Sequence, residues 1–133
     1  MRSDQITRRF NPTWITRGVD DECMNLCEEL AIDMVTAKIS SSFLRNIFGE
    51  LRRIEAGGYD KHHTEFVLLR PKLAYTCGRA IERNQGAKDE LNALQEFYKL
   101  SAQNVVDASG FKNLVSIMEA IIAFHKANGG DNK

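Results

Sequence analysis

Residues 111–127 read FKNLVSIMEAIIAFHKA. Apolar residues recur here every three or four positions, which is the spacing of one face of an α-helix. Ile117, Ala120 and Phe124 widen this apolar face, and a helix that is apolar over so much of its circumference packs on several sides. We therefore predict that this segment is the central helix of the fold.

The same apolar spacing indicates helices in four earlier segments, 19–38, 42–55, 64–83 and 88–108. Pro71 lies inside the third of them, where it either begins a new helix or kinks a continuous one. No segment alternates with the period of two that is typical of a β-strand. The sequence predicts an all-α protein, a single compact bundle of about five helices with an N-terminal arm.

The 133 residues are enough for one domain. We predict an extended N-terminal arm over residues 1–18, a helical bundle domain over residues 19–130 and a short tail over residues 131–133. Phe10 and Trp14 are expected to anchor the arm, either to its own bundle, the commoner outcome, or to a neighbouring chain.

The composition excludes several classes of protein. No apolar run approaches the ~20 residues of a membrane span, and residues 1–18 lack the apolar segment of a signal sequence. We therefore expect a cytoplasmic protein that is not associated with a membrane.

The formal net charge is zero, which argues against a nucleic-acid binder held by its overall electrostatic field. However, residues 38–83 carry nine basic and five acidic residues, whereas residues 19–34 carry six acidic residues and no basic one.

The motifs that would indicate an enzyme are absent. No phosphate-binding G-x-x-x-x-G-K-[ST] loop, G-x-S-x-G or H-E-x-x-H motif occurs. His125 ends an apolar face and is predicted to be packed and hydrogen-bonded, although an enzyme that uses Cys77 with His125 remains an alternative. Glu119 interrupts the apolar helix and is predicted to pair with an arginine or a helix cap. We predict a protein without catalytic activity.

A metal site is not expected either. The three cysteines, Cys23, Cys27 and Cys77, are an odd number in a chain without a signal sequence, which favours free thiols, and free cysteines are usually buried. His62 and His63 are adjacent, so on a helix their side chains point in different directions and make a poor chelate. We predict buried thiols, no metal and no other cofactor.

The clearest basic pattern consists of Lys72, Arg79 and Arg83, at i, i+7 and i+11 on the polar face of one predicted helix. Arg45 and Arg52 lie seven residues apart at the border of another apolar face, where their stems can pack while their charged heads reach solvent or a ligand. The composition alone favours the plainest interpretation, a protein-interaction bundle whose charges are simply solvated.

Three segments resemble a known family. Residues 39–47 read ISSSFLRNI, residues 69–79 read LRPKLAYTCGR, and residues 119–130 read EAIIAFHKANGG. In this order they resemble the small helical subunit of the type III-A CRISPR interference complex, the Csm complex. Phe124 stands where the family usually has tyrosine, and Met118 where an aromatic residue is common. Residues 1–38 match no part of the family pattern.

The resemblance implies a non-catalytic subunit in antiviral defence. Several copies would form a minor filament beside the backbone subunits that hold the guide RNA. The filament would lie along the crRNA–target RNA duplex, mainly on the target strand. It would also join the large signalling subunit to the assembly. A subunit that serves any target sequence contacts phosphates and sugars, not base edges. We expect RNA contacts from Arg45, Lys72 and Arg79, which lie inside the motifs, with Arg52 and Arg83 extending the stripe. The alternative is a stand-alone helical adaptor that binds protein only.

Overall fold

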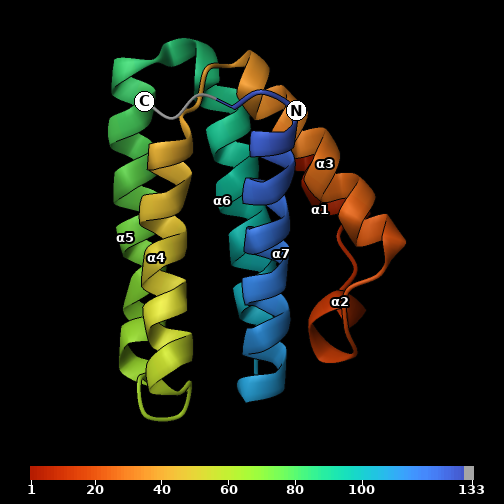
Figure 1. The fold of residues 1–133 in the computed structure, drawn as a ribbon, viewed down its shortest axis with the longest axis vertical. Helices are drawn as coiled ribbons and strands as arrows, with labels where there is room; N and C mark the ends of the chain where they lie inside the picture. Colours follow the sequence, from red (N-terminus) through yellow and green to blue (C-terminus); the bar gives the residue numbers. More distant parts are fainter. Residues whose placement is uncertain (131–133) are drawn as a thin grey trace.

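The computed structural model describes residues 1–130, and within them the only regular elements are helices (Figure 1). The prediction of an all-α protein is therefore confirmed. The predicted number of about five helices is corrected to seven α-helices and one short 3-10 helix within residues 1–130. The predicted tail, residues 131–133, lies outside the described residues. The elements are α1 (Ser3–Arg9), α2 (Thr13–Thr16), α3 (Asp21–Thr36), α4 (Ser41–Gly57), α5 (His63–Arg83), η1 (Gln85–Ala87), α6 (Lys88–Gln103) and α7 (Ala108–Ala127).

Helix α7 is central, as its sequence predicted. It packs against α2, α3, α4 and α6, and its apolar face is buried from Phe111 to Ile121. Helices α4, α5, α6 and α7 close a ring in which each packs against two others, while α3 and α1 cover the side of α6 and α7 away from the α4–α5 pair (Figure 1). Among the helices of residues 1–130, none has the length and apolar character that a membrane span needs.

Three of the long helices begin at side-chain caps. Asp20 accepts a hydrogen bond from the Cys23 amide at 2.9 Å, Ser40 from the Phe43 amide at 3.1 Å, and Asp107 from the Gly110 amide at 2.8 Å. Each cap satisfies one backbone N–H that the first turn of a helix leaves without a partner. Helices α3, α4 and α7 therefore start where their sequences place a short polar residue.

Residues 1–18 are not extended, in contrast to the prediction. They form α1 and α2, and the side chains of Ile6, Trp14 and Ile15 are buried in the core. Phe10 meets the Trp14 ring edge-on at a centroid distance of 5.5 Å and the Phe97 ring at 6.1 Å. The aromatic residues thus anchor this segment to its own bundle, as expected, but they do so as part of a folded helical layer.

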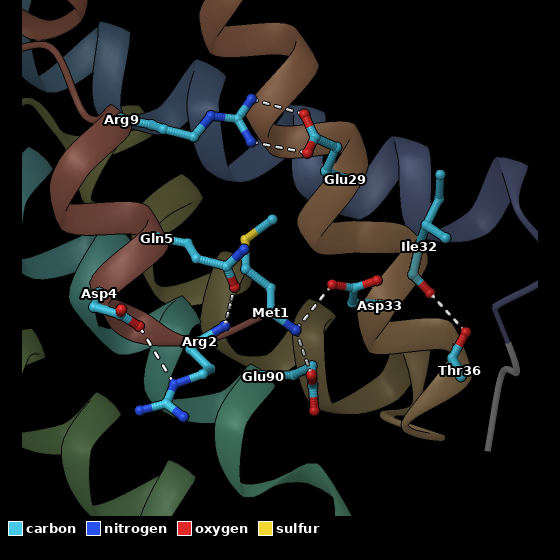
Figure 2. A network of polar contacts seen from close by, with 10 residues as sticks. All are labelled: Met1, Arg2, Asp4, Gln5, Arg9, Glu29, Ile32, Asp33, Thr36 and Glu90. Atoms are coloured by element: carbon cyan, nitrogen blue, oxygen red, sulfur yellow. Dashed lines mark hydrogen bonds and ion pairs between the residues drawn. The ribbon is translucent and has the colours of Figure 1, made fainter.

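Polar contacts fasten α1 to the neighbouring helices (Figure 2). The Arg9 guanidinium makes two hydrogen bonds with the Glu29 carboxylate of α3, at 2.8 and 2.7 Å. The amino group of Met1 lies 2.8 Å from Asp33 of α3 and 2.6 Å from Glu90 of α6 (Figure 2). These contacts join residues far apart in sequence, which is why the local pattern of residues 1–18 did not indicate the helices.

Helix α5 runs without interruption through Pro71, so the continuous alternative holds. Pro71 cannot donate a backbone hydrogen bond to the carbonyl of Val67. Both residues are exposed, so water can satisfy that carbonyl.

The α4–α5 pair, residues 41–83, is called here the α4–α5 hairpin. Its helices are joined at one end by residues 58–62, and its two ends meet at the other end of the bundle (Figure 1). There the Asn84 side-chain amide donates to the Ala37 carbonyl at 3.0 Å, across 47 residues of chain. The chain therefore enters and leaves the hairpin at the same end of the bundle.

Candidate nucleic-acid interface

The α4–α5 hairpin has a net positive charge, although the chain as a whole is neutral. It contains eight basic and five acidic residues, whereas residues 1–37 contain four basic and seven acidic ones. In Figure 1 the hairpin forms one flank of the molecule, with α3 on the opposite flank. The neutral chain therefore has a basic flank and an acidic flank, and all five predicted RNA-contacting residues lie on the basic one.

On α4, Arg45 and Arg52 differ in their surroundings. Arg45 is exposed and only approaches the Ser42 hydroxyl, at 3.5 Å. The Arg52 guanidinium lies 3.2 Å from Glu119 of α7 and 3.8 Å from Glu55, and it stands 5.5 Å from the centroid of the Phe48 ring. The prediction that Glu119 pairs with an arginine is confirmed, and Arg52 is oriented toward α7.

On α5, Lys72 lies on the side that faces α4, where it lines a groove between the two helices. Arg79 donates a hydrogen bond to the Tyr75 hydroxyl at 2.9 Å, and its Nε lies 4.0 Å from Glu82. Arg83 is exposed near the end of the helix, beside the segment around Lys38 that leads into α4. The three α5 cations are all exposed to solvent.

The predicted stripe is therefore divided between two helices. Arg52 turns toward α7, whereas Lys72 turns toward α4 from the other helix of the hairpin. Over residues 1–130, Arg45, Lys72 and Arg83 make no ion pair, but Arg52 and Arg79 do. Three of the five cations thus have no ion-pair partner within the described part of the chain.

Charge pairing also crosses between the two helices of the hairpin. Arg53 pairs with Glu50 on its own helix and lies 3.7 Å from Glu65 on α5. The hydrogen bond from His62, at 2.7 Å, is the main cause that lowers the pKa of the Glu65 carboxyl. Adjacent residues Arg52 and Arg53 thus bind carboxylates on different neighbouring helices, Arg52 on α7 and Arg53 on α5.

Sequence reasoning missed Tyr75 as a candidate. Its side chain is 66% exposed, and it lies between Lys72 and Arg79 on the surface of α5. The sequence did indicate Tyr75, because Lys72 at i−3 and Arg79 at i+4 are its neighbours on a helix surface. An exposed aromatic ring with a cation on each side is a common feature of single-stranded nucleic-acid sites.

His125, one of the two residues considered for catalysis, is packed in the core. His125 is buried; its Nε2 donates to the Ile39 carbonyl at 2.7 Å, and Nδ1 is 3.4 Å from the Ser41 hydroxyl. This confirms the packed, hydrogen-bonded imidazole. It also fixes the end of α7 to the turn before α4.

All three cysteine side chains are buried and unpaired by disulfides, as predicted. Burial raises the pKa of Cys77 to about 12, and the hydrogen bond to Cys23, together with burial, raises the pKa of Cys27. In the described part of the chain no group of three or more His, Cys, Asp or Glu side chains could hold a metal ion.

Residues 20–131 match the sequence profile of the family described as Csm2 Type III-A. The chain belongs to the Csm2 family. It is therefore a small subunit of the type III-A CRISPR effector complex, and the resemblance found in the sequence is confirmed. The range matched to Csm2 begins at the cap of α3 and includes the whole α4–α5 hairpin, so the expectation that residues 1–38 match no part of the family is wrong for residues 20–38. No curated protein and no solved structure matches the chain.

Proposed function

We propose that this Csm2-family subunit stabilises the guide RNA–target RNA duplex through contacts of the α4–α5 hairpin with the RNA backbone. The observation that carries the proposal is the set of three hairpin cations, Arg45, Lys72 and Arg83, that are exposed and make no ion pair within residues 1–130. A cation that is already free of a carboxylate can neutralise a phosphate without first giving up a partner. Each such contact releases a counterion and adds salt-dependent affinity.

The paired cations, Arg52 and Arg79, extend this surface. Their ion pairs are exposed, and exposed pairs contribute little stability, so exchange of a carboxylate for a phosphate costs little. Backbone contact suits a subunit that must accept any target, because phosphates carry no sequence information.

The proposed assembly is a minor filament of several copies, bound to the backbone subunits and the large signalling subunit, without a catalytic step of its own. The opposite signs of charge on the α3 and α4–α5 flanks support contacts between neighbouring copies, since a basic patch on one chain can face acidic residues on another. The acidic residues between 20 and 33 are the part of the chain assigned to this contact.

The test is charge reversal of Lys72 and Arg83 together, by Lys72→Glu and Arg83→Glu, in a reconstituted type III-A complex. We expect weaker binding of target RNA and a shallower salt dependence, by roughly 0.7 to 0.9 in the log–log slope for each phosphate that is no longer neutralised. Lys88→Glu with Lys112→Glu changes the charge equally on exposed residues of α6 and α7, and is expected to leave both quantities unchanged.

Gel filtration would first establish that both variant complexes assemble. Equal affinity and equal salt slope in the wild-type and Lys72/Arg83 variant complexes would contradict the proposal and favour a subunit that binds protein alone.

A further inference from the structure

A groove of about 370 Å³ lies between α4 and α5. The contacts with the RNA backbone proposed above do not use this groove as a whole. Its floor is formed by the apolar side chains of Ile47, Leu69 and Leu73, which are themselves nearly buried. Asn46 on α4 and Lys72 with Tyr75 on α5 form its walls. An apolar floor with a few polar groups at the edge is typical of a small-ligand site.

The Tyr75 ring is held in place although it is 66% exposed. Arg79 donates to its hydroxyl at 2.9 Å, and the Arg79 guanidinium lies 5.9 Å from the ring centroid. The hydrogen bond favours this position of the ring beside the groove, so less side-chain freedom is given up when a flat ligand stacks on it.

We propose that this groove receives one unpaired RNA base, which stacks on Tyr75 while the adjoining phosphate lies beside Lys72. The inference rests on the proposed RNA contact of the hairpin and names the part of the RNA that enters it. Every base has a flat face that can stack on an aromatic ring, so this contact tolerates any sequence. A base inside a duplex is stacked on both faces, and therefore only an unpaired nucleotide can occupy the groove.

The charges at the groove agree with a nucleotide as its occupant. The carboxylate of Glu50 also lines the groove, but it is paired with Arg53, so its negative charge is compensated. Lys72 makes no ion pair within residues 1–130 and remains available for the phosphate. The Asn46 amide has both a donor and an acceptor for the edge of a base.

The test compares two labelled oligonucleotides with the same number of phosphates, an oligouridine and an abasic strand, by fluorescence anisotropy with the full-length chain. We expect the wild-type chain to bind oligouridine more tightly, by roughly 5- to 150-fold for one stacked base. Tyr75→Ala is expected to remove this difference, and Tyr75→Phe, which keeps the ring, to retain most of it.

Equal binding of the two strands by the wild-type chain would overturn the base site and leave the backbone contacts standing. Binding of neither strand would also overturn the base site, while the backbone contacts are judged separately by the Lys72/Arg83 variant of the assembled complex. In that complex, target RNA that contains 5-iodouridine and is irradiated is expected to form an adduct with Tyr75. Adducts at other residues only would overturn the site.

Discussion

The guanidinium of Arg52 on α4 lies 3.2 Å from the carboxylate of Glu119 on α7, and both side chains are more than half exposed. The pair connects the α4–α5 hairpin to the central helix. Because water surrounds both groups, it holds the two helices only weakly, and Arg52 stays available to another anion.

Removal of the Glu119 charge is expected to have a small effect on stability. Glu119→Gln should lower the free energy of unfolding by about 0.2–1 kcal/mol, which is the usual contribution of an exposed ion pair. Urea denaturation of this variant, of Arg52→Gln and of the double variant gives the pair's coupling energy. A decrease of several kcal/mol would contradict the view that Arg52 can leave Glu119 for a phosphate.

The helical structure of residues 3–9 can be tested at Ile6, which is fully buried. Ile6→Ala should lower the free energy of unfolding by about 2–5 kcal/mol, because it leaves a cavity between α1 and the core. Arg8→Ala, at an exposed position of the same helix, is the matched control and should change stability by less than about 0.5 kcal/mol. Equal effects of the two substitutions in urea denaturation would mean that α1 does not pack as described.

The Met1 amino group is expected to make stability depend on alkaline pH. Burial acts to lower the pKa of this group, but the hydrogen bonds and charges of Asp33 and Glu90 outweigh it and raise the pKa above the usual value of 8.0. The stabilisation is therefore complete below about pH 8 and disappears as the pH rises through the pKa of the folded state. Urea denaturation over this range should show a weaker decline in Glu90→Gln than in the wild-type chain, and parallel curves would contradict this role of the amino group.

The cysteines are expected to be unreactive in the folded protein. Alkylation requires a thiolate, and burial raises the pKa of Cys77 to about 12. Mass spectrometry after treatment with iodoacetamide at pH 7 should find no modified cysteine in the native chain and three in urea. Rapid modification of any native cysteine would show that its environment is more open than the structure indicates.

The five long helices were predictable because each contains enough turns to show the apolar spacing of a helix. Helices α1 and α2 were not, because α1 has seven residues with one buried side chain, Ile6, and α2 has only four residues. Their helical structure depends on contacts such as Arg9 with Glu29 and Phe10 with Phe97, which no local pattern contains.

The candidate site was predictable to a similar degree. Spacing within one helix placed Lys72, Arg79 and Arg83 on a common face, since a helix fixes the directions of its own side chains. It could not show that Arg52 meets Glu119, 67 residues away, nor that Tyr75 stands beside a groove formed with α4. These features depend on how two helices pack, which the sequence of either helix does not determine.

The hydrogen bond from Asn84 to the Ala37 carbonyl brings the entry and exit of the α4–α5 hairpin together. Because the chain leaves α3 and reaches η1 at this one place, this junction does not depend on the length of the hairpin. Under the proposed function, a longer or shorter hairpin would therefore change the length of the surface offered to RNA and leave the same junction in place.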